Sequence, residues 1–312
     1  MIPATYPLRA SHLTIGELID LYMAGYEGRD TTRAQRLAWW RGKLGTITLA
    51  DISDDHVHAA IEQMKSEPAR YYAGRDAYGK PIYRAKKRQL SGATINRILN
   101  AFAGVCTWAI KRRIAPKGWI HPCRGIERHP EGQGRTRFLS EDERTRLLAA
   151  CRGARWPKMY ALVLLGLTTG ARKGELLGLR WQDVDFAQAL LHIPTTKNGD
   201  PKALPLTPAA REELQRLQGA PTKLVFESTR SPGQPFGFEP EWKELLKACG
   251  IRNFRFHDLR HSCASMLAAN GATLLEIGDL LGHRQVSMTK RYSHLAASHR
   301  SQLVHRVMGD LR

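Results

Sequence analysis

The sequence predicts a mainly α-helical protein with a small β component, an α+β fold in two domains. Hydrophobic residues make up 42% of the 312 residues, which is enough for packed cores, and this length suits about two domains. Apolar residues recur at helical spacing behind capping signals along much of the chain. The pair Asn198-Gly199, between two apolar runs of residues 189–206, predicts a β-hairpin.

The first domain is expected to be helical and to span residues 1–126. Thr14 and Glu17 match the capping-box pattern, a hydroxyl at the helix start and a carboxylate three residues on, which opens a helix through Tyr22. Further helices are expected over residues 32–44, 54–65 and 93–113.

Residues 66–92 depart from the helical pattern and are expected to form a long loop or small hairpin. This insert is rich in glycine, tyrosine and basic residues, and basic side chains beside tyrosines suit phosphate contact and stacking. The long helix that follows it ends in three basic residues. We therefore expect DNA contact at Tyr83, Arg84, Lys86, Lys87, Arg88, Lys111, Arg112 and Arg113.

A linker is expected at residues 127–137, where glycine, proline and charged residues form a flexible composition. The second domain, residues 138–312, opens on another capping box at Ser140 and Glu143. Its expected helices cover residues 156–167, begin at Thr207-Pro208, run from Thr273 to Gly282, and end with an amphipathic helix in residues 295–312.

The charge balance favours a polyanionic partner. Lys and Arg number 48 against 29 Asp and Glu, a formal net charge of +19 that is shared almost equally between residues 1–130 and 131–312. The longest apolar run, residues 159–167, is too short to span a membrane, and no signal peptide is visible. Five cysteines without a C-x-x-C pair indicate a reducing compartment and argue against a disulfide framework and a thiolate zinc site. We expect a cytoplasmic protein without membrane association.

Four short pieces of the second half carry the candidate chemistry. They are the run 168–181 with Arg172 and Glu175, Lys197 beside the hairpin turn, His257-x-x-Arg260, and Leu281-Gly282-His283 followed nine residues later by Tyr292. In this order they closely resemble the catalytic domain of the tyrosine recombinases, the phage-integrase family, over roughly residues 135–295. Any one piece is a weak signal, but a chance match of all six catalytic positions in order is improbable.

The residue types suit the family's chemistry. Cleavage of a DNA phosphodiester places charge on the non-bridging oxygens, and guanidinium groups meet it with paired donors and a permanent charge. Arg172 and Arg260 are the candidates. If residues 257–261 are helical, His257 and Arg260 lie on one face and can point at one phosphate.

The resemblance implies that Tyr292 is the nucleophile. A phenol is weakly nucleophilic at neutral pH, so it needs a cationic site. Its attack would form a covalent 3′-phosphotyrosyl link and release a 5′-hydroxyl. Because the link conserves the energy of the broken bond, a second 5′-hydroxyl can reverse the step without ATP, a metal or any other cofactor.

The resemblance also implies roles for the other motif residues. Lys197 matches the general acid that protonates the leaving oxygen, and Lys202, across the turn, is its rival. His257 and His283 match two histidines that assist proton transfer or bind the phosphate, and which of them moves protons stays open. Glu175 is expected to orient or neutralise its neighbours. His261 and His294 are assigned to structure.

The resemblance implies a helical core-binding domain and a mixed α/β catalytic domain that together form a C-shaped clamp on double-stranded DNA. It further implies a homo-tetramer on DNA that is a monomer or dimer when free, with the C-terminal helix docked on a neighbouring protomer. Accessory DNA-bending or directionality proteins are expected partners. A phage or prophage integrase is the favoured interpretation. Because the first helix is expected to begin at Thr14, we expect no arm-binding domain before it.

Three other functions remain as alternatives. A type IB topoisomerase shares the chemistry, but the hairpin lysine and the L-G-H-x8-Y spacing favour a recombinase. A DNA-binding regulator with a silent catalytic domain is disfavoured by the complete set of six residues. A metal-dependent nuclease is disfavoured because the spacing of the cysteines gives no zinc site.

Overall fold

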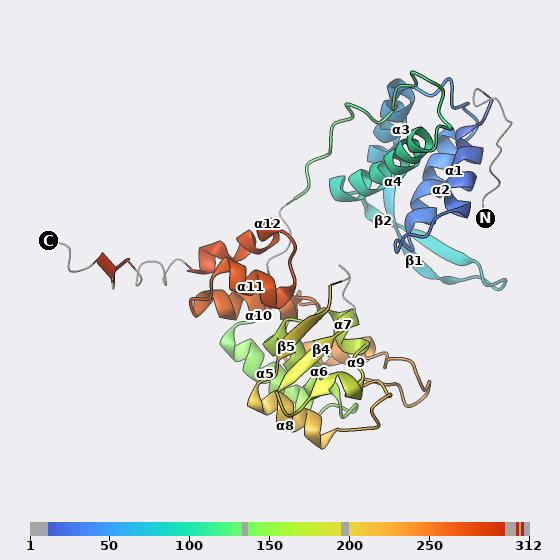
Figure 1. The fold of residues 1–312 in the computed structure, drawn as a ribbon. Coiled ribbons are helices and arrows are strands. Elements are labelled where there is room, and N and C mark those ends of the chain that lie inside the picture. Colours follow the sequence, from blue (N-terminus) through green and yellow to red (C-terminus); the bar gives the residue numbers. More distant parts are fainter. Residues whose placement is uncertain (1–11, 133–136, 195–199, 297–303, 306, 309–312) are drawn as a thin grey trace. The chain divides into compact units, whose positions relative to one another are not determined.

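The chain folds into two compact units, Met1–Gly134 (unit 1) and Arg135–Arg312 (unit 2). The computed structural model describes residues 12–132, 137–194, 200–296, 304–305 and 307–308 (Figure 1). Helices dominate both units and the sheets are small, so the predicted fold class is confirmed. Over these residues, every helix is too short or too polar to cross a lipid bilayer.

Unit 1 packs four helices around one apolar core. Its elements are α1 (Ile15–Ala24), α2 (Arg33–Leu44), α3 (Asp54–Ser66), β1 (Pro68–Arg75), β2 (Pro81–Gln89) and α4 (Gly92–Lys111). The core is built around Trp40, whose ring stacks on Phe102 with 4.7 Å between centroids and whose Nε1 donates to Ile98 O at 2.9 Å. Thr14 and Glu17 form the predicted capping box at the start of α1.

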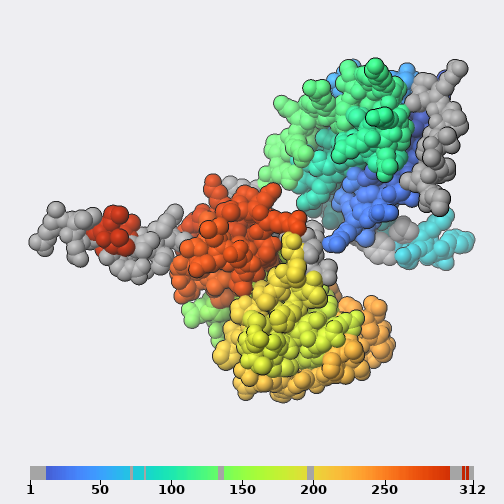
Figure 2. Space-filling model, viewed as in Figure 1, coloured from blue at the N-terminus to red at the C-terminus, as the bar shows by residue number. Residues whose placement is uncertain are grey.

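The insert of unit 1 is an antiparallel two-stranded ribbon, β1 paired with β2, with two register irregularities. Figure 2 shows its cyan tip standing out from the helices of unit 1. Residues 82–89 are exposed on both faces of β2, and Tyr78 at the tip is 89% exposed. Arg84, Lys86, Lys87 and Arg88 lie along this exposed strand. The ribbon therefore presents charge to solvent and adds little to the core.

Unit 2 surrounds the buried helix α6. Its elements are α5 (Glu141–Arg152), α6 (Met159–Thr169), α7 (Lys173–Leu177), the 3₁₀ turn η1 (Trp181–Asp183), β3 (Val184–Asp185), β4 (Leu190–Ile193), β5 (Lys202–Pro205), α8 (Pro208–Arg216), α9 (Glu239–Ala248), α10 (Asp258–Ala269), α11 (Leu274–Leu281), α12 (Val286–Thr289) and the 3₁₀ helix η2 (Lys290–Ala296). The sheet is antiparallel in the order β3-β4-β5. Helix α10 packs on α6, α11 and η2, which brings three parts of the chain together.

Most predicted elements of unit 2 occur near their expected positions. Strands β4 and β5 form the expected hairpin, although its turn, residues 195–199, lies outside the described residues. Helix α6 begins at Met159 rather than at Trp156, because a residue that precedes a proline, here Pro157, disfavours helical backbone. Of the expected C-terminal helix, only residues 304–305 and 307–308 are described, and they are helical.

Two left-handed glycines end the helices that lead to the motifs. Gly170 follows α6 with φ 62°, and Gly282 follows α11 with φ 65°. Glycine adopts this conformation without the strain that a Cβ atom causes. A Cβ on Gly170 would also lie 2.5 Å from Leu281 Cδ2 and 3.3 Å from Cys263 Sγ. The close approach of α6, α10 and α11 thus requires glycine at position 170.

Gly170→Ala is expected to lower the free energy of unfolding by about 2 kcal/mol or more, because it adds left-handed strain and overpacks the contact with Leu281. Urea unfolding followed by tryptophan fluorescence measures the change. Gly174→Ala is the matched control, since a Cβ there meets nothing within 4 Å and alanine suits a helix better than glycine. Equal stability of the two variants would contradict this account of Gly170.

Candidate active site

Arg260 lies at the centre of the candidate site, on α10, and is only 4% exposed. Its guanidinium donates to two backbone carbonyls at helix ends, Gly170 O after α6 at 2.8 Å and Leu281 O, the last of α11. Helix C-termini carry partial negative charge, so these carbonyls suit a cation. Burial, and then the nearby Arg172, lower the pKa of Arg260 to about 10, so the group remains charged at neutral pH.

Arg172 reaches the same turn from the other side. It is the extended N-cap residue of α7, and Glu175 at the third helical position accepts its backbone amide at 2.8 Å. Its guanidinium donates to Glu175 Oε1 at 2.8 Å and to Gly282 O at 3.3 Å. Consecutive carbonyls at the end of α11, those of Leu281 and Gly282, therefore hold Arg260 and Arg172 side by side.

Glu175 and Lys202 form a buried ion pair beside the arginines. Glu175 Oε2 lies 2.9 Å from Lys202 Nζ, and the two side chains are 5% and 11% exposed. Burial opposes ionisation of Glu175, but bonds from the Arg172 amide, Lys202 and the Arg172 guanidinium hold its pKa below the usual range. Burial lowers the pKa of Lys202, and Glu175 acts in the opposite direction. Lys202, the rival of Lys197 in the sequence, thus lies at the site.

Positive charge exceeds negative charge in this cluster. Arg172, Arg260 and Lys202 are three cations, and among the described residues Glu175 is the one carboxylate paired with them. Like-charge repulsion contributes to the lowered pKa values of both Arg260 and Lys202. An anion bound between these side chains relieves the repulsion and stabilises their charged forms. The cluster therefore fits a phosphate group.

His283 follows directly from the turn that holds the arginines. The amides of Gly282 and His283 donate back to Asp279 O at 3.0 Å and Gly278 O at 2.9 Å, which closes a Schellman motif. His283 Nδ1 lies 2.8 Å from the hydroxyl of Thr289. Burial, and then the nearby arginines, lower the pKa of His283 to about 4, so its ring is neutral at pH 7.

His257 lies next to Arg260 in the turn that opens α10. Its carbonyl accepts the Arg260 amide at 3.2 Å, as the H-x-x-R spacing predicted for a helical turn. The residue is exposed, and its ring meets that of His261 edge-on, 5.3 Å between centroids. Partial desolvation and then Arg260 lower the pKa of His257.

Tyr292 lies in η2, packed on α10 and α11, and is 4% exposed. Its hydroxyl is 2.5 Å from Nδ1 of His261. Burial raises the pKa of Tyr292, while Arg291 and Arg260 act in the opposite direction. The sequence analysis assigned His261 to structure rather than to the site. The one sequence feature that could have indicated a role in the site is its position directly after Arg260.

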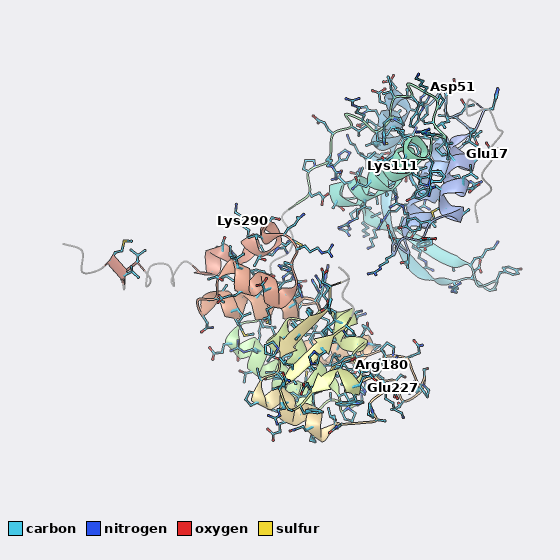
Figure 3. All side chains as sticks on the ribbon, in the orientation of Figure 1. Glu17, Asp51, Lys111, Arg180, Glu227 and Lys290 are labelled. Carbon is cyan, nitrogen blue, oxygen red and sulfur yellow. The ribbon has the colours of Figure 1, made fainter. Side chains whose placement is uncertain are left out.

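The remaining predicted residues are Lys197 and the proposed DNA contacts, and none of them is seen at the cluster of Arg172, Arg260 and Lys202 in the described part of the chain. Lys197 is outside the described residues. Tyr83, Arg84, Lys86, Lys87 and Arg88 are exposed along β2 of unit 1, and Lys111, Arg112 and Arg113 are exposed at the end of α4, where Figure 3 labels Lys111.

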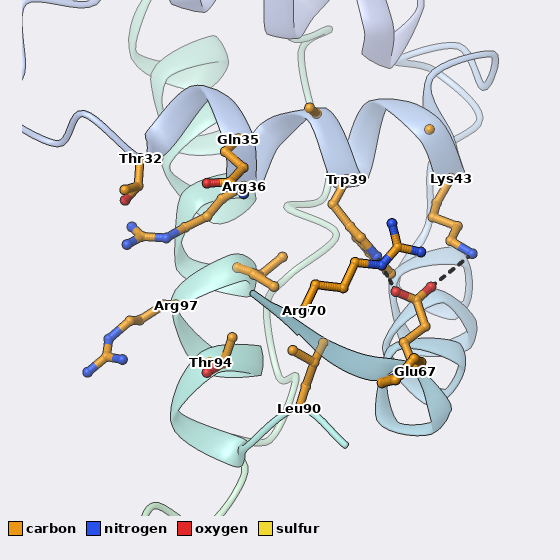
Figure 4. A pocket seen from close by; sticks show the side chains of 14 residues that line it. Thr32, Gln35, Arg36, Trp39, Lys43, Glu67, Arg70, Leu90, Thr94 and Arg97 are labelled. Atoms are coloured by element: carbon orange, nitrogen blue, oxygen red, sulfur yellow. Dashed lines mark hydrogen bonds and ion pairs between the residues drawn. The ribbon is translucent and has the colours of Figure 1, made fainter. Parts of the chain in front are cut away.

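Unit 1 also has a basic pocket of about 700 Å³ between α2, α4 and the base of the ribbon (Figure 4). Lys43 and Trp39 on its wall both contact the carboxylate of Glu67, at 3.2 and 3.0 Å. Arg70 and Arg97 line the same pocket and have no carboxylate partner among the described residues. The sequence patterns did not single out these two arginines, because they come from separate elements.

Residues 137–299, slightly more than half of the chain, match the model of the phage integrase family. The chain therefore belongs to this family, the tyrosine recombinases, as the motifs predicted.

Among curated relatives, the chain is 34% identical over 178 residues to a shufflon-specific DNA recombinase of Escherichia coli, an alignment that covers 57% of this chain and 45% of the relative. It is 30% identical over 179 residues to the integrase of Salmonella phage P22, with 53% and 45% covered. The chain thus spans slightly less than half the length of these relatives.

Among solved structures, the Tn1549 transposon integrase in complex with a circular intermediate DNA resembles this chain with a TM-score of 0.69. The likeness covers 93% of this chain and 99% of the integrase chain at 16% identity. At this identity the likeness shows a shared fold.

Glu175→Gln is expected to lower the free energy of unfolding by about 3 kcal/mol at pH 7, because it leaves Lys202 buried without its counter-charge. The pKa of Glu175 is lowered in the folded state, so its stabilisation is present above the ordinary carboxyl pKa and is lost as pH falls through the folded pKa. The difference between wild type and variant should therefore shrink from pH 7 towards pH 3, as measured by urea unfolding.

Glu244→Gln is the matched control, since Glu244 pairs with Arg155 on the surface, where both side chains are at least two-thirds exposed. Its cost should stay below about 1 kcal/mol at every pH. A constant difference between Glu175→Gln and wild type across this pH range would contradict the ion-pair account.

Proposed function

We propose that this chain is a site-specific DNA recombinase of the integrase type, which cuts and rejoins DNA strands through a covalent 3′-phosphotyrosyl intermediate. The observation that carries the proposal is the uncompensated positive cluster of Arg172, Arg260 and Lys202, with Tyr292 beside it. A phosphodiester carries the negative charge that balances the excess positive charge of this cluster. A phenol next to such a site can serve as a nucleophile towards phosphorus.

In the proposed reaction, the Tyr292 oxygen attacks the scissile phosphorus and the bond to the 5′-oxygen breaks. Arg172 and Arg260 stabilise the charge that develops on the non-bridging oxygens, and His257 and His283 donate further hydrogen bonds. Neutral His283, anchored on Thr289, is suited to donate rather than to compete as a third cation. Attack by a 5′-hydroxyl of another strand reverses the same step and restores the phosphodiester.

The leaving 5′-oxygen needs a proton, and a lysine at the β4–β5 hairpin is the proposed donor. Lys197 is the candidate from the family pattern. Lys202 is the second candidate, because its ammonium is buried at the cluster and its lowered pKa makes proton release easier. Its pairing with Glu175 favours instead a supporting role, in which it holds that carboxylate against Arg172.

Unit 1 is proposed to hold duplex DNA through charge. A two-stranded ribbon fits the major groove, and the exposed side chains of Arg84, Lys86 and Arg88 can contact phosphates. The basic pocket with Arg70 and Arg97 offers further phosphate contacts. Lys111, Arg112 and Arg113 extend the basic surface.

The assembled form is proposed to be a homo-tetramer on two DNA sites, with accessory DNA-bending or directionality proteins and a phage or prophage origin. Val304, Val307 and Met308 in the C-terminal segment are more than half exposed, which suits a helix that docks on a neighbouring protomer. The reaction requires access to chromosomal DNA, so a cytoplasmic location in a bacterial host is part of the proposal.

Tyr292→Phe is expected to abolish the covalent protein–DNA adduct while DNA binding stays within about twofold of wild type, because only the attacking oxygen is removed. The adduct is measured as an SDS-resistant band on nicked suicide duplexes that carry candidate attachment sequences, with EDTA present. Tyr160→Phe is the matched control, since its hydroxyl accepts from Arg152 at the N-terminal end of α6, the end opposite Gly170.

An adduct that persists in Tyr292→Phe would refute the assigned nucleophile. Wild-type protein that binds these duplexes but never forms an adduct would favour the silent regulator, and relaxation of supercoiled DNA without any strand exchange would favour the topoisomerase.

Replacing Lys86, Lys87 and Arg88 together with alanine is expected to weaken binding to a random-sequence duplex and to flatten its salt dependence. The slope of log K against log salt should fall by about 0.9 for each DNA phosphate that the variant no longer neutralises. Fluorescence anisotropy at several salt concentrations measures both quantities.

The control is the alanine triple of Arg146, Arg155 and Arg216, which removes the same net charge from residues that are each paired with a carboxylate. If both triples flatten the salt dependence equally, overall charge rather than the ribbon governs binding.

A further inference from the structure

His261 contacts the hydroxyl of Tyr292, and the family motifs give His261 no role in the reaction. His261 Nδ1 lies 2.5 Å from the Tyr292 hydroxyl, the atom that attacks phosphorus in the proposed reaction. The ring centroids are 6.1 Å apart, so the contact is made at the ring edge, through the nitrogen. It joins α10 to η2, and both residues are largely withdrawn from solvent.

The titratable or charged groups that face His261 among the described residues bear on its protonation. These groups are His257, Asp258, Arg260 and Arg291, together with His283 and the Tyr292 phenol. Burial first, then His257 and Arg291, lower the pKa of His261 to about 4, and Asp258 opposes them. The ring is therefore neutral at pH 7 and has one unprotonated nitrogen.

The Tyr292 phenol is also neutral in this environment, because burial raises its pKa. A neutral phenol and a neutral imidazole at 2.5 Å share one proton, which the phenol donates when the imidazole carries its own proton on Nε2. The phenol must lose this proton as it bonds to phosphorus, and His261 Nδ1 is the acceptor in contact with it.

We propose that His261 is the general base that takes the Tyr292 proton during strand cleavage; this assignment rests on the proposed function. The Tyr292 O–H bond breaks, its proton passes to His261 Nδ1, and the phenolic oxygen bonds to phosphorus. The bond from phosphorus to the 5′-oxygen breaks, and that oxygen receives a proton from the hairpin lysine. In the rejoining step the imidazolium of His261 returns its proton to Tyr292.

Bound DNA makes the transfer of the proton from Tyr292 to His261 easier. The positive neighbours Arg260 and Arg291 disfavour a charged His261 in the DNA-free protein. A phosphate anion on Arg260 offsets part of that repulsion, so the basicity of His261 rises when substrate is present. The base is thus strongest in the complex that reacts.

The test compares His261→Ala and His261→Asn with wild type. The asparagine Oδ1 can accept the hydrogen bond at the place of Nδ1, but an amide oxygen takes no proton at neutral pH. The substrate is a nicked duplex selected by wild-type protein from a randomised nicked library as an SDS-resistant adduct. The readout is the single-turnover rate of adduct formation at saturating protein, with duplex binding and thermal unfolding measured in parallel.

Both variants are expected to bind the duplex like wild type and to form the adduct about 10²-fold more slowly, or slower still, at pH 7. Their rates should recover by about tenfold per pH unit between pH 7 and 9, because without a base the rate follows the fraction of ionised phenol. The rate of adduct formation by wild-type protein should rise less steeply with pH over this range. His58→Ala, an exposed histidine of α3, is the control and should keep the wild-type rate.

A wild-type rate in His261→Asn combined with a slow His261→Ala would show that His261 only positions the phenol, and would overturn the assignment. A wild-type rate in both variants would overturn it as well. A selection in which wild type yields no adduct at all would refute the proposed function instead, and with it any base for that reaction.

Discussion

The candidate site depends on one backbone feature, the left-handed turn that ends α11. The carbonyls of Leu281 and Gly282 leave the helix at this turn and accept hydrogen bonds from Arg260 and Arg172. Backbone carbonyls orient a guanidinium without neutralising it, whereas a carboxylate in the same place would cancel its charge. Arg260 is therefore fixed in position and keeps its charge for an anion, while Arg172 and Lys202 share the single carboxylate of Glu175.

Apolar packing around the cluster holds its charged side chains in position. Gly166 allows Leu259 of α10 to approach α6, and Gly170 admits Leu281 of α11, so three helices converge on Arg260. Tyr292 and His261 share this packed environment, which keeps phenol and imidazole neutral and in contact. The same burial that stabilises unit 2 thereby holds the positive charges close together and keeps the Tyr292 phenol protonated.

Local signals in the sequence predicted local structure well. The capping boxes at Thr14, Ser140 and Thr273 begin helices at the expected residues, because a cap acts within one helical turn. The predicted start of α6, Trp156, was wrong by three residues, because Pro157 disfavours helical backbone at the residue before it despite the apolar pattern. The ribbon of unit 1 was left open between loop and hairpin, because a ribbon exposed on both faces has no alternation of apolar and polar residues to reveal it.

The sequence by itself determined the family, the order of the helices and most of the residues that meet at the site, because these are recorded in short motifs at fixed spacing. Only the tertiary structure decided what each residue touches. Lys202 proved to be the buried partner of Glu175, and His261, assigned to structure from the sequence, proved to contact the Tyr292 hydroxyl. The first contact joins α7 to β5 and the second joins α10 to η2, and tertiary packing rather than local pattern decides which segments meet.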